Sequence, residues 1–182
     1  MKRVKTVLVD KYKVVAGFVS DIKGNKLLIK DGDDSAAILV GDTNRFGKQN
    51  ILKPGDLIVA AVDNDWNIVE LEQANHTFLI DLGGKKGQIA CRVGRVGPVD
   101  KGAKGQTIVS FPEASGASTK WKKVSFWNGR EGNLADTSAT DFRKTNSADG
   151  KAISPYMLII GKKVGDKFVN GIAYLQVRRP TA

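Results

Sequence analysis

Short apolar segments recur along the first part of the chain, and Gly, Asn, Asp or Pro lies between most of them. The segments cover residues 14–19, 26–29, 36–40, 57–62 and 68–71. They are rich in Val and Ile, the residue types that favour β-strands. This rhythm predicts an all-β fold.

Turn signals separate these apolar segments. The Gly24-Asn25 pair, the acidic run at residues 31–34 and the sequence at residues 63–65 are each typical of a hairpin loop. Five strands with one longer connection, residues 41–52, predict a small barrel of the oligonucleotide-binding (OB) or SH3-like kind. We therefore expect two small barrels, one in residues 1–80 and one in residues 81–182.

In the second region, period-two alternation separates the expected strands into a core row and an opposite row. The core row contains Ile89, Cys91, Val93, Ala173, Leu175 and Val177. The opposite row contains Arg92, Tyr174, Gln176 and Arg178. We expect the core row to be buried and the opposite row to lie on an exposed face.

The chain has 182 residues and a formal net charge of +10, which is concentrated in its second half. Residues 1–80 contain 11 basic and 11 acidic residues, whereas residues 81–182 contain 18 basic and 8 acidic residues. A basic region beside a neutral one favours a polyanionic partner, and nucleic acid is the commonest such partner. The alternative is a solvated lysine-rich surface without a partner.

The composition also indicates the cellular compartment in which the protein is expected. The single cysteine, Cys91, excludes an intramolecular disulfide and favours a reducing environment. No segment approaches the roughly 20 apolar residues of a membrane span, and the apolar run near the N-terminus is too short for a signal peptide. We expect a cytoplasmic protein with no membrane partner.

Residues 121–127 combine two aromatic rings with an ammonium group on one face of an expected strand. One row of this strand holds Trp121, Lys123, Ser125 and Trp127, and the other holds Lys122, Val124 and Phe126. The first row suits nucleic-acid bases that stack on rings while a cation holds the phosphates. The alternative is that either tryptophan packs beneath the N-terminal domain.

The order of features around this strand is specific. A run with glycines at residues 94–97, a turn ending at Gly105, a strand at residues 107–111 and a small-residue loop precede residues 121–127. From residue 88 to residue 179 the sequence resembles the bacterial-type single-stranded-DNA-binding protein (SSB) family. The segments at 156–164 and 171–178 resemble the last two strands of that family.

The resemblance implies an OB fold for the second region and a role for particular residues. In the SSB family the third strand carries an aromatic residue, a basic residue, apolar residues and a second aromatic residue, and the two rings are base-stacking platforms. Trp121, Lys123 and Trp127 occupy those places. No cofactor is implied.

The sequence departs from the family in three places. Residues 128–154 form a longer polar segment where the family has a compact helix, and residues 1–80 have no counterpart. The closing residues 178–182 differ from the acidic C-terminal tip that recruits replication and repair partners in the family. These departures suggest a specialised relative of phage or mobile-element type.

We therefore expect a non-catalytic, sequence-tolerant binder of single-stranded DNA in replication or recombination. The predicted nucleic-acid-binding residues are Trp121, Lys122, Lys123, Trp127, Arg92, Arg95, Tyr174 and Arg178. RNA is an alternative partner, because stacking alone does not distinguish the two sugars. We expect a homo-oligomer, since one barrel presents a short site, and an N-terminal barrel that serves oligomerisation or a protein partner.

Two other classes of function remain. A structural or assembly protein would bind other proteins through its β domains. An enzyme, such as a nuclease that uses the acidic turn, is the third class. This turn is more typical of a hairpin than of a metal site, because the run starting at Asp31 has Ala36 and Asp42 where a calcium-binding loop needs Gly and Glu. No catalytic or metal-binding residues are predicted. His76 is expected to have a surface or packing role, and Trp66 is expected to pack or to form a domain contact.

Overall fold

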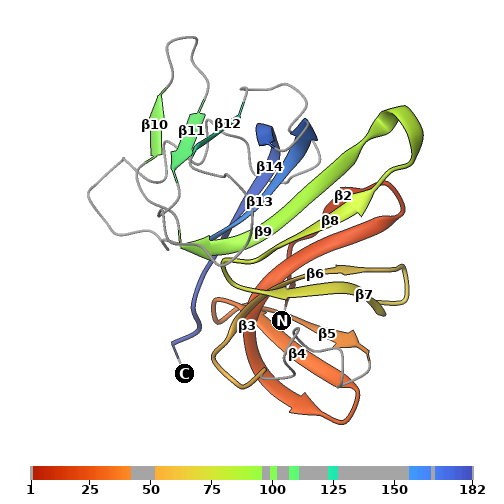
Figure 1. Ribbon diagram of the computed structural model, residues 1–182. Helices are drawn as coiled ribbons and strands as arrows, with labels where there is room; N and C mark the ends of the chain where they lie inside the picture. Colours follow the sequence, from red (N-terminus) through yellow and green to blue (C-terminus); the bar gives the residue numbers. More distant parts are fainter. Residues whose placement is uncertain are drawn as a thin grey trace.

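The structure is a computed structural model that describes residues 2–41, 52–95, 99–101, 107–110, 123–126, 156–164 and 167–181. These residues form two β-sheets of seven strands each (Figure 1). A single turn of 3-10 helix, η2 (Gly84–Lys86), joins two strands of the second sheet. The predicted all-β fold is confirmed.

The first sheet contains the N-terminal strands in the order β1-β5-β4-β3-β6-β7, with β2 beside β3. The strands are β1 (Lys2–Arg3), β2 (Val7–Val9), β3 (Tyr12–Lys23), β4 (Lys26–Asp31), β5 (Ser35–Val40), β6 (Leu57–Val62) and β7 (Ile68–Gln73). β1 lies parallel to β5, and the other pairs are antiparallel. An isolated parallel bridge between Val40 and Asn67 joins the end of β5 to the residue before β7.

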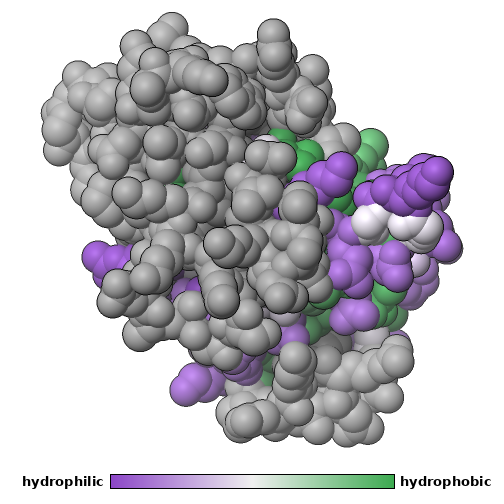
Figure 2. All heavy atoms as spheres, turned by 45° about the horizontal axis from the view of Figure 1, so that its top comes forward, coloured by the Kyte–Doolittle hydropathy of each residue, from purple (hydrophilic) through white to green (hydrophobic). Residues whose placement is uncertain are grey.

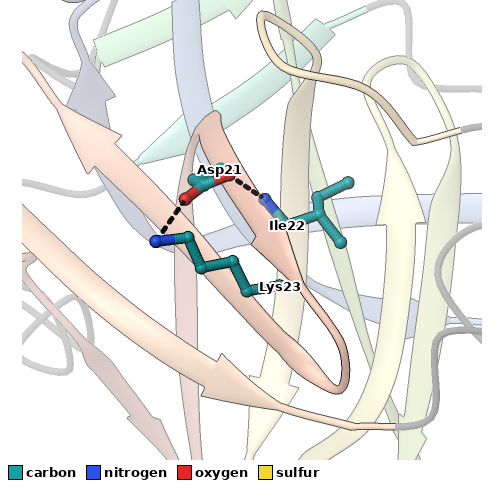
Figure 3. A network of polar contacts seen from close by, with 3 residues as sticks. All are labelled: Asp21, Ile22 and Lys23. Atoms are coloured by element: carbon teal, nitrogen blue, oxygen red, sulfur yellow. Dashed lines mark hydrogen bonds and ion pairs between the residues drawn. The ribbon is translucent and has the colours of Figure 1, made fainter.

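The long strand β3 holds this sheet together because it pairs with β6 from Lys13 to Phe18 and with β4 from there onward. A register shift after Val19 leaves Ser20 as an extra residue, and such a bulge bends the strand and increases its twist. Beyond the bulge, the Asp21 carboxylate accepts the N–H of Ile22 at 2.9 Å and lies 3.6 Å from the Lys23 ammonium (Figure 3). Both charges are exposed, so this ion pair contributes little to stability.

The second sheet has the order β10-β11-β12-β14-β13-β9-β8. Its strands are β8 (Thr77–Asp81), β9 (Gln88–Arg95), β10 (Val99–Lys101), β11 (Thr107–Ser110), β12 (Lys123–Phe126), β13 (Tyr156–Val164) and β14 (Lys167–Val177). β12 lies parallel to β14, and the other pairs are antiparallel. β9 and β10 are consecutive along the chain, yet they occupy distant places in this order.

A shared core joins the two sheets. Buried residues of β9, β13 and β14 pack against buried residues of β2, β3 and β6. All six members of the predicted core row are in this cluster, so that prediction is confirmed. Burial also raises the pKa of the Cys91 thiol, as expected for a core cysteine.

A second core lies on the other face of β3 and β6. It contains Val15, Leu27, Ile29, Leu39 and Ile58, all fully buried. Because successive residues of a strand face opposite ways, β6 contributes alternately to both cores and is buried along its whole length. This double burial explains its unbroken apolar sequence.

The division between the sheets lies at residues 74–76, because β7 belongs to the first sheet and β8 pairs with β9 in the second. The predicted domain boundary, at residues 80 and 81, falls within β8. The shared core crosses this division, and the assignment of two separate domains stays a prediction.

Candidate nucleic-acid interface

Of the strand predicted at residues 121–127, the structure describes residues 123–126. Trp121, Lys122 and Trp127 lie outside the described residues, so their predicted roles stay predictions. Between them, the backbone of β12 pairs with β11, where Lys123 faces Ser110, and with β14, where Ser125 faces Asn170. A strand at this place in the sequence is thus confirmed for residues 123–126.

Arg92 and Tyr174 are buried, with exposed fractions of 1% and 2%. Both pair with Ile159, which is also fully buried, so the three residues share one face of the second sheet. The expectation that Arg92 and Tyr174 lie on an exposed face is wrong, because both faces of the sheet are buried at this place. One face lies in the shared core, and the face that carries Arg92 and Tyr174 is covered too. Burial also lowers the pKa of Arg92.

Arg95 and Arg178 are exposed, as predicted. Arg95 closes β9 opposite Tyr156, and Tyr156 in turn faces Val177, the residue before Arg178. The guanidinium of Arg178 donates to the side-chain oxygen of Gln176 at 3.4 Å. These pairings bring two of the predicted cations to one end of the second sheet.

A third cation, Arg179, lies at the same end. Its guanidinium is 4.5 Å from the centre of the Phe18 ring and 5.5 Å from that of Tyr156, and it donates to the Tyr156 hydroxyl at 3.3 Å. The two rings meet edge to face with centroids 5.3 Å apart. Sequence reasoning missed this cluster because Phe18, Tyr156 and Arg179 come from three distant segments.

The acidic turn between β4 and β5 binds the residues that follow β14. The Asp31 carboxylate accepts the N–H of Arg178 at 2.7 Å, and the Arg178 carbonyl accepts the N–H of Gly32 at 2.7 Å. The Asp33 carboxylate accepts the N–H and the hydroxyl of Thr181 at 2.9 and 2.8 Å. A hairpin turn was predicted here, and its contact with the chain's last residues was not.

These contacts affect the two carboxylates differently. The hydrogen bonds from Thr181 hold the pKa of Asp33 below its usual range. Burial raises the pKa of Asp31, and the hydrogen bond from Arg178 opposes that shift. Within the described residues, no three His, Cys, Asp or Glu side chains are grouped to hold a metal ion.

The described surface is mixed in character. On the face shown in Figure 2, hydrophilic residues cover much of the described part, and hydrophobic patches lie between them. No described helix is both long enough and apolar enough to cross a membrane.

Comparison with known proteins gives little guidance. No protein-family model matches the chain, and no curated protein matches it. One solved structure with some similarity is a deletion mutant of the single-stranded DNA binding protein from Thermus aquaticus. It is 14% identical, with 100% of this chain and 90% of that chain covered and a TM-score of 0.21. A similarity this weak establishes no shared fold.

Proposed function

We propose that this chain is a non-catalytic, sequence-tolerant binder of single-stranded DNA, and that its second sheet is an OB-like barrel that carries the binding face. The order of strand pairing supports this most directly. β9 pairs with β13, β12 lies parallel to β14, and β10, which closely follows β9, pairs with β11. If β9 and β10 count as one bent strand, five strands form a ring in the OB order.

The first sheet supports the same interpretation. Its first long strand, β3, pairs with β4 and β6, and the bridge from Val40 to Asn67 brings β5 parallel to the start of β7. The same pattern of pairing is found among the corresponding strands of the second sheet. We therefore propose two OB-like barrels that share one core.

In this proposal β12 is the third strand of the second barrel, and the third strand contributes to the ligand face of OB folds. Trp127 directly follows its described part, and Trp121 lies two residues before it. Bases would stack on these two rings, while Lys122, Lys123, Arg95 and Arg178 would contact phosphates. One barrel offers a short site, so association of several chains on one strand is part of the proposal.

The stacking claim is tested with Trp127→Ala and the matched control Trp127→Phe, which keeps a ring. Loss of one stacked base is expected to weaken binding of oligo(dT) by about 1–3 kcal/mol, and the Phe variant is expected to retain most of the affinity. Affinity is measured by titration at fixed salt, and circular dichroism checks the fold. A folded Ala variant with unchanged affinity would refute the stacking role.

The phosphate contacts are tested by salt. The logarithm of affinity is expected to fall with the logarithm of salt concentration, with a slope of about 0.7 per phosphate contact for a single strand. A flat response would count against a basic binding face. Competition between DNA and RNA oligonucleotides decides which polymer is preferred, and failure to bind either would favour the protein-assembly alternative.

A further inference from the structure

The outer face of β4 and β5 is apolar in the middle and basic around it. The strand register places Lys30 beside Ala36, Leu28 beside Ile38 and Lys26 beside Val40 on this face. Their neighbours Leu27, Ile29 and Leu39 face the second core instead. Ile38 is 53% exposed although it lies in the middle of a strand. Folding of the first sheet does not require an apolar row on its solvent side.

A groove of about 390 Å³ lies over this row. Leu28, Ile38 and Val40 are among its lining residues, and Arg3, Asp65 and Trp66 also line it. Arg3 comes from β1, where it pairs with Ala36. The groove is therefore built by two neighbouring strands, by a third strand added at their edge, and by the loop between β6 and β7.

That loop holds Trp66 in an uncommon conformation. Trp66 has a φ of 64°, in the left-handed region, where a non-glycine residue needs support from its surroundings. The Asp63 carboxylate provides it, since it accepts the N–H groups of Asp65 and Asn67, both at 2.9 Å. The Trp66 carbonyl accepts the N–H of Val40 at 2.9 Å, which ties the loop to β5.

Cations surround the Trp66 ring. The Arg3 guanidinium lies 4.9 Å from its centre and the Lys13 ammonium 5.2 Å. The ring thus holds the Arg3 guanidinium at the groove, and a flat guanidinium can stack on a base as well as pair with a phosphate. Lys26 and Lys30 stand on the same sheet face, and Asp65 is the one acidic residue among the described residues that line the groove.

We propose that this groove binds one or two nucleotides of single-stranded DNA, as a second contact in addition to the site proposed on the second sheet. The inference rests on the proposed function. Bases would lie on Leu28 and Ile38 and against the guanidinium of Arg3, and phosphates would face Lys26 and Lys30. The basic surround favours a polyanion, and the apolar row and the flat guanidinium favour one that carries bases, because bases can stack on both.

The most direct test uses Trp66 as a reporter. The chain has three tryptophans, so the double variant Trp121→Phe and Trp127→Phe leaves Trp66 alone. Oligo(dT) is expected to change the fluorescence of this variant, because nucleotides would displace water beside the ring and its cation. An unchanged signal, in a variant that still binds oligo(dT) by an independent measurement, would overturn the groove.

Affinity provides the second readout. Arg3→Glu and Ile38→Gln are each expected to weaken binding of a long oligo(dT) at least about fivefold, the lower limit for one stacked base. Matched controls are Lys2→Glu, the neighbour of Arg3 on the same strand, and Leu8→Gln, whose side chain is 54% exposed on β2. Equal losses in variants and controls would overturn the proposal.

The outcomes separate this inference from the proposed function. If Trp127→Ala weakens binding and the groove variants do not, the second sheet binds DNA and the groove does not. If neither set has an effect, both proposals fail. A Trp66 signal with an acidic, apolar peptide but not with oligo(dT) would identify a protein partner and overturn the nucleotide assignment.

Discussion

The two sheets use equivalent strand pairings, but one face of each differs in its exposure to solvent. The two faces are the solvent face of the first sheet and the face of the second sheet that lies away from the shared core. In the first sheet, the outer row of β4 and β5 is open to solvent, with Ile38 exposed. In the second, the row that contains Arg92 and Tyr174 is covered. Alternation thus assigns residues to faces, whereas the rest of the chain decides which faces are exposed.

The two regions of the chain, residues 1–80 and residues 81–182, also differ in net charge. Residues 1–80 are neutral overall, and the excess positive charge belongs to residues 81–182. Yet the first sheet gathers Arg3, Lys26 and Lys30 around one apolar row, while its acidic turn contacts the residues after β14. A neutral total therefore conceals a basic face and an acidic turn.

The largest expected effect tests whether the two sheets are one folding unit. Leu158 is fully buried in the shared core, and Leu158→Ala is expected to lower the free energy of unfolding by about 2–5 kcal/mol. Urea unfolding followed by fluorescence and by circular dichroism should give one coincident transition. Ile38→Ala, at an exposed position, is the control and should change stability by less than about 0.5 kcal/mol. Two separate transitions would show that the sheets fold independently.

An intermediate effect distinguishes a buried arginine from an exposed one on the same strand. Arg92→Met is expected to lower the free energy of unfolding by about 1–3 kcal/mol, since the groups that contact Arg92 lose their partner in a buried place. Affinity of the folded protein for oligo(dT) should not change. Arg95→Met should leave stability nearly unchanged and reduce the salt slope by about 0.7. The reverse pattern would restore Arg92 to the binding face.

The smallest expected effect concerns Asp33. Its pKa is lowered by the bonds from Thr181, so these contacts contribute stability above the unfolded pKa near 3.8 and lose it as pH falls through the folded value. Asp33→Asn should speed hydrogen exchange of the Thr181 amide at neutral pH. Asp65→Asn is a control, because Asp65 makes no contact with residues 178–181 among the described hydrogen bonds. Equal exchange in wild type and Asp33→Asn at neutral pH would contradict the contact.

The sequence predicted the features that depend on neighbouring residues. Gly24 and Gly32 mark hairpins and both have positive φ, and the core row of β9 and β14 followed from alternation. The burial of Arg92 could not be predicted, because it depends on parts of the chain far from β9. The contact of Asp31 with Arg178 spans 147 residues and leaves no local signal. For the same reason, the groove could not be found from Trp66 alone.

The acidic turn has one more consequence, for the connectivity of the molecule. The N–H of Lys2 donates to the carbonyl of Asp34, and Thr181 binds the adjacent Asp33. Residues 2 and 181 are therefore both held at this turn, through adjacent residues, and a linker could join the segments that contain them. A circular permutant opened in the turn at Gly84–Lys86 would keep every described strand intact. A fluorophore or a surface anchor attached at the new ends would then lie between β8 and β9 of the second sheet, and not at the acidic turn of the first sheet.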